Sequence, residues 1–348
     1  MAEPPTASSS ATTGQAELTV ALFNFENGGR YAPGRYNFTG LRRAFTSLET
    51  VPALIAFNEA KEYNLWGEAY GLAAAEEISQ ILQRPYDMRL LPAKGGRIPS
   101  MVLFDPCVLS LVFWGNDDDT VYPNIRSSLR FRIRGTTTEF GVYCDQWAHF
   151  DGAERWNRAK EIDHFGGWDV PCLLMGDFNG TASGPHLPQR SWNDAPRHKV
   201  YHKGIQLPDG SWEPDCRALD HLLGEWTGTT DDDGWHRAPG TRFVALAEIA
   251  HFEHNMPASL AFCPTVNRNI DTGGALLIDW ILLNQAWRDR GRLVPDTYRV
   301  HVPAGTTRAD YPSDHRLVTA AVQLPVLLAA WAEWELARNT VILRDRAM

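Results

Sequence analysis

Short apolar runs rich in β-branched and aromatic residues recur along most of the chain and alternate with a few helical patterns. Runs of about four to eight such residues are typical of buried strands, whereas apolar residues at a period near 3.6 indicate amphipathic helices. The expected strands span residues 18–24, 53–58, 101–104, 109–113, 129–133, 140–144, 172–175, 276–283 and 317–322. The expected helices span residues 41–48, 72–82 and 152–164. This alternation predicts an α/β fold with layered sheets.

The chain has 348 residues, and α/β units often exceed about 250 residues, so we expect one elaborated domain over residues 18–323. Residues 1–17 are rich in Pro, Ser and Thr and are expected to form a disordered leader. Residues 183–275 are rich in Pro, Gly, Trp, His and Asp, which indicates a long insertion that shapes substrate access. The mostly apolar start of residues 324–348 predicts a helical C-terminal tail.

The composition is that of an ordinary globular protein, with 44% hydrophobic residues and a formal net charge of -9. That charge argues against a protein that coats nucleic acid by electrostatics alone, although a carboxylate-rich metal site is itself acidic. The five cysteines form no C-x-x-C pair, which disfavours a zinc or dithiol site. Since neither a secretory signal nor a run long enough to span a membrane is evident, we expect a cytoplasmic protein.

The sharpest chemical motif is Met-Gly-Asp-Phe-Asn, residues 175–179, at the end of an apolar run. Residues two apart share a face of a strand, so Asp177 and Asn179 should point together while Phe178 points into the core. A carboxylate can take a proton from an attacking water, and a neutral amide can hold that water or a phosphoryl oxygen. The pair is therefore suited to hydrolysis.

Five further polar residues lie at the ends of apolar strands, directly before one, or inside one. Asn24 and Glu59 end the first and second strands, and a carboxylate such as Glu59 is a typical ligand of Mg²⁺. Asp314 and His315 stand directly before the last strand. Asp279 lies inside a buried strand and needs a partner there. If it accepts a hydrogen bond from His315, the pKa of the imidazole rises and a cationic His could neutralise charge in a transition state.

Together these residues resemble the endonuclease/exonuclease/phosphatase superfamily, which includes pancreatic-type deoxyribonucleases and abasic-site endonucleases. Its ordered motifs are a strand ending in Asn, a Gln-Glu or similar pair, a strand leading to His or Tyr, G-D-F-N, I-D-x-I and S-D-H. The resemblance implies a four-layer α/β/β/α sandwich with two mostly antiparallel sheets. It implies that Glu59 binds Mg²⁺, with Mn²⁺ as the alternative, helped by Asn24 and Asp314. It also implies that Asp177 activates water beside Asn179, and that Asp279 pairs with His315.

The sequence departs from these motifs at two places. Asn58 stands where the family usually has Gln, which keeps an amide. More seriously, Gln146-Trp147 stands where many members have a His-Trp pair, which leaves the usual His or Tyr position open. We expect His149 to fill it, with Tyr143 as the alternative.

The resulting hypothesis is a divalent-metal-dependent phosphoesterase, with a nuclease or other phosphodiesterase favoured over a small-molecule or nucleotide phosphatase. Nucleic acid or a nucleotide is thus the expected partner, and the oligomeric state stays open. Tryptophans of residues 183–275 could stack on bases or wall off a small pocket. A non-catalytic binding module is a further alternative, which the retained carboxylates disfavour.

Overall fold

The computed structural model describes residues 13–91, 98–115, 127–228, 237–267, 273–305 and 307–327. Two main sheets form its centre. Sheet one has the order β15 (Arg292–Leu293), β17 (Leu317–Leu327), β1 (Thr13–Asn24), β4 (Leu54–Asn58), β6 (Ser100–Phe104), β5 (Asp87–Leu91), with β16 (Arg299–His301) also on β17. Sheet two has the order β13 (Phe243–Ala245), β14 (Asp279–Asn284), β10 (Cys172–Asp177), β9 (Glu139–Gln146), β8 (Ser128–Ile133), β7 (Leu109–Trp114).

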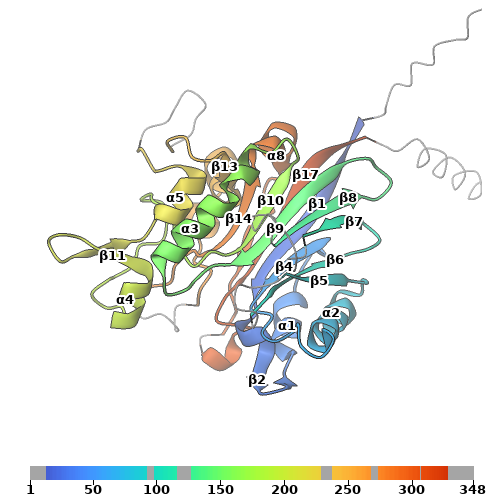
Figure 1. Cartoon of the computed structure of the whole chain (residues 1–348), viewed down its shortest axis with the longest axis horizontal. Helices are drawn as coiled ribbons and strands as arrows, with labels where there is room; N and C mark the ends of the chain where they lie inside the picture. The colour runs from blue at the N-terminus through green and yellow to red at the C-terminus, as the bar shows by residue number, and fades with distance from the viewer. Residues whose placement is uncertain are drawn as a thin grey trace, which may run out of the picture.

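Within these sheets β1 runs parallel to β4, and β10 runs parallel to β9. The other pairs described are antiparallel. Helices α1 (Thr39–Phe45) and α2 (Ala69–Leu82) cover the outer face of sheet one, while α3 (Gly152–Ile162) and α5 (Arg217–Leu223) lie outside sheet two (Figure 1). The prediction of a four-layer sandwich with two mostly antiparallel sheets is confirmed.

Strand alternation divides the apolar residues of sheet one between two cores. Val20 and Leu22 of β1 belong to the large core that joins the two sheets. Ala21 and Phe23 belong to the second core, with residues of α1 and α2. Because successive side chains of a strand point to opposite faces, a strand buried on both sides is apolar at nearly every position. This explains why the sequence shows continuous apolar runs.

The nine expected strands correspond to β1, β4, β6, β7, β8, β9, β10, β14 and β17, and the three expected helices to α1, α2 and α3. Helix α3 begins after Asp151, whose carboxylate accepts hydrogen bonds from the backbone N–H groups of Ala153 and Glu154. Such an N-cap satisfies donors that have no partner within the helix. In the parts of the chain that the structure describes, we find no helix with the length and apolar character needed to cross a membrane.

The predictions for both ends of the chain are partly wrong. Strand β1 begins at Thr13, so the expected leader of residues 1–17 is too long, and residues 1–12 lie outside the described ranges. Strand β17 continues to Leu327, so the helical tail expected from residue 324 is wrong for residues 324–327. The rest of that tail lies outside the described residues. The physical reason is common to both ends: β1 and β17 pair with each other from Thr13–Leu327 to Leu22–Val318.

The segment at residues 183–275 is more ordered than its composition indicates. It contains α4 (Arg197–Lys203), β11 (Gly204–Gln206), β12 (Trp212–Pro214), α5, β13, α6 (Leu246–Glu248) and α7 (Ala258–Ala261). Helix α5 packs beside α3, and β13 pairs with β14 at the edge of sheet two. Part of the expected insertion is therefore a component of the sandwich itself.

Candidate active site

The polar strand ends meet at one edge of the two sheets. Asn24 pairs with Asn58 across the parallel strands β1 and β4, so both strands end at the same level. In sheet two, Asp177 at the end of β10 lies between Asp279 of β14 and Gln146 of β9. Register thus assembles residues that are up to 255 positions apart in the sequence, from Asn24 to Asp279.

The Asp177 carboxylate is the centre of this cluster. Its Oδ2 accepts hydrogen bonds from Asn24 Nδ2 at 3.0 Å and Asn179 Nδ2 at 2.9 Å, and Gln146 Nε2 lies 3.5 Å away. Its Oδ1 accepts from the Asn179 backbone N–H at 2.9 Å. Burial raises the pKa of Asp177, which His315 counteracts and Asp279 reinforces. A carboxylate held by neutral amides in this way is suited to accept a proton.

Asn58 ties the two sheets together beneath this carboxylate. Its Oδ1 accepts from the backbone N–H of Asp177 at 2.9 Å, and its Nδ2 donates to Ser100 Oγ and to the Asp145 carbonyl. The side chain is fully buried. A buried amide that satisfies donors and acceptors on both sheets holds their separation constant. Asn58 is therefore a positioning residue for Asp177.

Glu59 follows β4 in a left-handed backbone conformation, with φ 61°. Such a conformation is unfavourable for a residue with a Cβ and is found where surrounding contacts hold it in place. Here Asn27 N donates to Oε2 at 2.7 Å and Gln146 Nε2 donates to Oε1 at 3.1 Å. Asn24 Nδ2 also lies 3.4 Å from Oε1. The turn directs the carboxylate toward the residues that hold Asp177.

Ser313 connects the last motif to the end of β1. Its hydroxyl lies 2.8 Å from the Asn24 carbonyl and 3.1 Å from Asp314 Oδ1, and it accepts from Glu26 N at 2.9 Å. Asp314 is thus brought beside Asn24. Asn24 Oδ1 is buried and has no hydrogen-bond partner among the described residues. An amide oxygen without a partner, in a cluster that also contains carboxylates, fits a hard divalent cation.

His315 and Asp279 form a buried pair, with 2.8 Å between Nδ1 and Asp279 Oδ2. His315 Nε2 lies 3.9 Å from Asp177 Oδ2. Burial lowers the pKa of His315, but Asp279 and Asp177 outweigh it and raise the pKa well above its usual value. The neighbouring carboxylates therefore favour the protonated form of the imidazole, which lies beside Asp177.

Two groups of residues could hold a metal ion. Asp177, Asp279 and His315 offer ligand atoms within 4.8 Å of one another. A protonated imidazole cannot ligate a metal, however, and Nδ1 is already shared with Asp279. The oxygen set of Glu59, Asn24 and Asp314 is the better match to Mg²⁺, which prefers carboxylates and other oxygens.

The open His or Tyr position is occupied by Gln146. Gln146 pairs with Asp177 in the sheet and contacts both Glu59 and Asp177. Tyr143 is an odd number of residues away and points to the opposite face, where its hydroxyl donates to Asp145 Oδ2 at 2.9 Å beneath Arg158. Burial raises the pKa of Tyr143 well above its usual value. The alternative role for Tyr143 is thus corrected: this phenol is part of the packing under α3.

His149 lies beyond the end of β9, because the chain leaves the sheet after Trp147. Its ring lies against those of Phe150 and His202, and within the described ranges it forms no hydrogen bond with Asp177 or Glu59. Partial burial and the charges of Lys203 and His202 lower the pKa of His149. It lies at the surface around the cluster, and its catalytic role stays a prediction.

Lys203, the last residue of α4, lies beside the cluster although no sequence motif pointed to it. Its ammonium donates to the Asn179 carbonyl at 3.0 Å and also to Asn179 Oδ1. Burial and nearby cations lower the pKa of Lys203 to about 7, although Asp177 opposes the shift. The short basic pattern Arg197-His198-Lys199 that precedes it was a signal in the sequence, but nothing there shows that α4 reaches β10.

Arg155 connects α3 to the same region. Its guanidinium donates to the carbonyls of Ala148 and His202, both at 3.0 Å, and lies 3.5 Å from Asp215 Oδ2. The residue is 1% exposed, so these partners stand in for water at the terminal nitrogens, whereas Nε has no hydrogen-bond partner among the described residues. Arg155 therefore ties α3, the exit of β9 and the end of α4 together.

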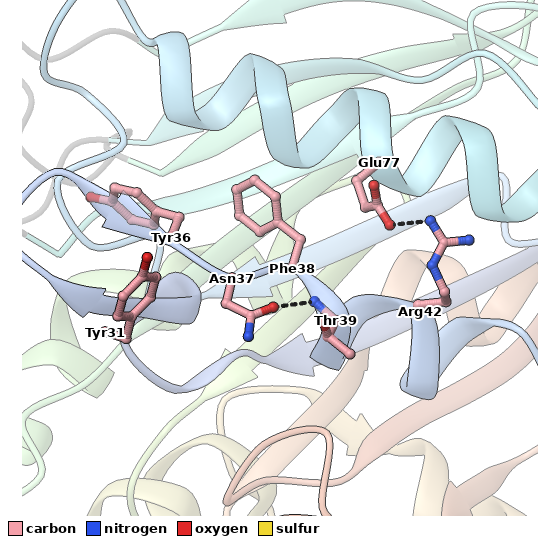
Figure 2. A pocket seen from close by; sticks show the side chains of 7 residues that line it. All are labelled: Tyr31, Tyr36, Asn37, Phe38, Thr39, Arg42 and Glu77. Atoms are coloured by element: carbon pink, nitrogen blue, oxygen red, sulfur yellow. Dashed lines mark hydrogen bonds and ion pairs between the residues drawn. The ribbon is translucent and has the colours of Figure 1, made fainter.

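The described residues line at least three pockets outside this cluster. One of about 540 Å³ is open and lies between α1, α2 and the β2–β3 hairpin (Arg30–Ala32, Arg35–Tyr36). Figure 2 shows Tyr31 and Tyr36 at one end and the Arg42–Glu77 ion pair, 2.6 Å long, at the other. None of its lining residues belongs to the polar cluster. A second pocket of about 770 Å³ begins at Thr181, two residues after Asn179, and is lined largely by residues 181–226.

No protein-family model matches the chain, and no curated protein matches its sequence. Solved structures do match it. An endonuclease/exonuclease/phosphatase family protein from Bacteroides thetaiotaomicron is 14% identical, with a TM-score of 0.51 over 89% of this chain and 99% of its own. An AP endonuclease from Archaeoglobus fulgidus is 14% identical, with a TM-score of 0.51 over 87% and 98%. ANGEL2, a 2',3'-cyclic phosphatase, is 12% identical, with a TM-score of 0.50 over 89% and 96%. These matches, together with the two-sheet sandwich, show that the chain has the fold of the endonuclease/exonuclease/phosphatase superfamily.

Proposed function

We propose that the protein is a divalent-metal-dependent phosphoesterase, and that it is a nuclease or another phosphodiesterase. The observation that supports this most directly is the buried Asp177 carboxylate, held by three amides between Glu59 and the His315–Asp279 pair. A proton acceptor, an oxygen-rich cation site and an imidazolium within one cluster are the components that hydrolysis of a phosphate ester needs.

Glu59, Asn24 and Asp314 would hold the metal, with Mg²⁺ expected and Mn²⁺ as the alternative. The fit rests on the orphaned Asn24 Oδ1 and on an all-oxygen donor set. A bound divalent cation would supply charge neutralisation for a phosphoryl oxygen and make a nearby water more acidic.

The protein groups then divide the remaining tasks. Asp177 would take a proton from the attacking water while the water oxygen bonds to phosphorus and the ester P–O bond breaks. The leaving alkoxide would take up a proton from solvent. Asn179 would orient that water or a phosphoryl oxygen without adding negative charge. The imidazolium of His315 would stabilise charge that develops on the phosphoryl group. Asp279 keeps the ring protonated on Nδ1 and fixes its orientation.

The choice of a polymeric substrate rests on the surface beside the site. The overall charge is -9, yet the seven residues of α4 contain Arg197, His198, Lys199, His202 and Lys203. A basic strip of this kind attracts a polyanion even on an acidic protein. A small-molecule or nucleotide phosphatase is the second candidate, and the second pocket next to Asn179 would then hold the rest of the molecule.

The test is hydrolysis of plasmid DNA, RNA, nucleotides and bis(p-nitrophenyl) phosphate, with Mg²⁺ or with EDTA, by the wild type and by Asp177→Ala. Metal-dependent turnover that is lost in Asp177→Ala would support the mechanism and rank the substrates. Turnover that persists in EDTA or in Asp177→Ala would refute it. Folded protein that binds neither Mg²⁺ nor any of these substrates would favour a non-catalytic module.

A further inference from the structure

The ammonium of Lys203 is held at the turn that follows β10. It contacts two oxygens of one residue, the carbonyl and the side-chain Oδ1 of Asn179. Asn179 in turn donates through Nδ2 to Asp177 Oδ2 at 2.9 Å and to the Trp147 carbonyl at 3.1 Å. The amide of Asn179 is thus fixed on its oxygen side by a cation and on its nitrogen side by the carboxylate and a carbonyl.

The surroundings of this ammonium are mostly cationic. Arg155, Lys199 and Arg190 are close enough to disfavour its charge, and only Asp177 among its strongest electrostatic neighbours favours it. Within the described ranges, no carboxylate forms an ion pair with Lys203. Its hydrogen-bond acceptors are both neutral oxygens.

A partly buried cation without an anion is unfavourable, because its lost hydration is not replaced. Arg155 nevertheless holds the preceding residue in place through the His202 carbonyl at 3.0 Å. That contact restrains the backbone from which the Lys203 side chain extends to Asn179. Groups kept in an unfavourable charge state beside a cluster of functional residues are typical of ligand sites, where the ligand supplies the missing charge.

We infer that Lys203 is a phosphate-binding residue of this site: it contacts a non-bridging oxygen of the substrate phosphoryl group and holds Asn179 in position. The identity of the ligand as a phosphoryl group rests on the proposed function. The inference also accounts for Gln146, a neutral amide at the position where the family resemblance expects an imidazole. Lys203, carried by α4, provides a second cation in addition to His315.

The experiment compares four variants in the binding of inorganic phosphate, measured by calorimetry at pH 6.5 and constant ionic strength, in EDTA and in Mg²⁺. Lys203→Arg keeps the charge, Lys203→Gln keeps a donor without charge, and Lys203→Met removes both. Lys160→Met is the matched control, since it removes one charge from the exposed end of α3, where the ammonium lies over the Trp156 ring, outside the basic residues of α4. We expect Kd to rise at least tenfold in Lys203→Gln and Lys203→Met. In Lys203→Arg and Lys160→Met it should change less than threefold.

Thermal unfolding shows which variants are folded. If Lys203→Met does not fold, the phosphate Kd of Lys203→Gln is compared with that of Lys203→Arg instead. Wild-type phosphate affinity in folded Lys203→Gln would overturn the inference, as would equal losses in Lys203→Gln and Lys160→Met. The two proposals fail separately. Phosphate binding that depends on Lys203 in a protein without turnover would refute only the hydrolase, whereas turnover with unchanged phosphate affinity in Lys203→Gln would refute only the role of Lys203.

Discussion

Asn24, Gln146 and Asn179 place three neutral amides around the Asp177 carboxylate, and two of them also contact Glu59. Amide donors let two carboxylates approach each other without a fixed cation between them. These amides therefore hold the carboxylates of Glu59 and Asp177 close to each other. Its properties at the residue scale follow from which of these side chains can accept a proton and which cannot.

Asp177→Asn should lower kcat on a phosphodiester by roughly 10²–10⁴-fold, because an amide preserves the shape but cannot take a proton. Initial rates with bis(p-nitrophenyl) phosphate at saturating Mg²⁺ measure this. Asp163→Asn is the control, since Asp163 pairs with His221 at 3.0 Å and has no contact with the cluster. A kcat within threefold of the wild type in Asp177→Asn would exclude Asp177 as the base.

Asp279→Asn should move the alkaline limb of the kcat–pH profile to lower pH. Burial lowers the pKa of His315 and Asp279 is the largest of the causes that raise it, so loss of that carboxylate lowers the pKa. A group that must be protonated is lost as pH rises through its pKa, and a lower pKa brings that loss at lower pH. If NMR shows that the pKa of His315 is lower in Asp279→Asn but the alkaline limb of the kcat–pH profile is unchanged, the positive charge of His315 is not needed for turnover.

At the scale of elements, the site depends on how α3 and α4 are tied to sheet two. Arg155 contacts the exit of β9, the end of α4 and Asp215 from a position that is almost fully buried. Gly176, near the end of β10, lets that strand approach β9 closely because it has no side chain. A Cβ at Gly176 would lie 2.0 Å from the Asp145 carbonyl oxygen.

Arg155→Met should lower the free energy of unfolding by about 3 kcal/mol or more, since it leaves two carbonyls and part of Asp215 without their buried partner. Arg217→Met is the control, because Arg217 binds the same Asp215 at 2.8 Å but is half exposed. That variant should lose less than about 1 kcal/mol. Urea unfolding followed by tryptophan fluorescence measures both, and equal losses would contradict the tie that we describe.

Gly176→Ala should destabilise the protein by about 1–3 kcal/mol, because a strand must shift to admit the methyl group. Gly167→Ala should have an effect close to zero, since a Cβ there meets no atom within 4 Å. The urea midpoints of unfolding compare the stability of the two variants, provided that their free energies of unfolding depend equally on urea concentration. Equal midpoints would show that β9 and β10 separate more easily than their register indicates.

For the molecule as a whole, the proposed cation site would link folding to metal binding. Glu59 and Asp314 come from distant parts of the chain and are brought together through Asn24 and Ser313 only in the folded state. A ligand that binds the folded but not the unfolded chain stabilises the former by mass action.

Mg²⁺ at about 100 times its Kd should therefore add about 2.7 kcal/mol and raise Tm by several degrees relative to EDTA. Glu59→Gln should remove most of this increase. Glu76→Gln, a change in an exposed residue of α2, should keep it. Differential scanning calorimetry measures the shift. The same increase in Glu59→Gln as in the wild type would place the ion elsewhere, with Asp177, Asp279 and His315 as the next group to test.

The sequence alone determined nine of the strands, because their runs are apolar on both faces, and it placed Asn24, Glu59 and Asp177 at strand ends. Asp279 was expected inside a strand and is the first residue of β14. Their meeting at one edge follows from the topology that the ordered motifs imply. Local pattern could not decide which residue after β9 faces Asp177. That depends on register, which pairs Asp177 with Gln146 and sends Tyr143 to the opposite face.

Only the tertiary structure brought Lys203 to Asn179 and Arg155 to His202. These contacts join segments with no shared periodicity, and short helices such as α4 owe their place to packing rather than to propensity. For the same reason the pairing of β1 with β17 overrode the helical pattern that begins at Leu324. A sequence specifies local conformation through nearby residues, whereas contacts between distant segments depend on how all the layers pack together.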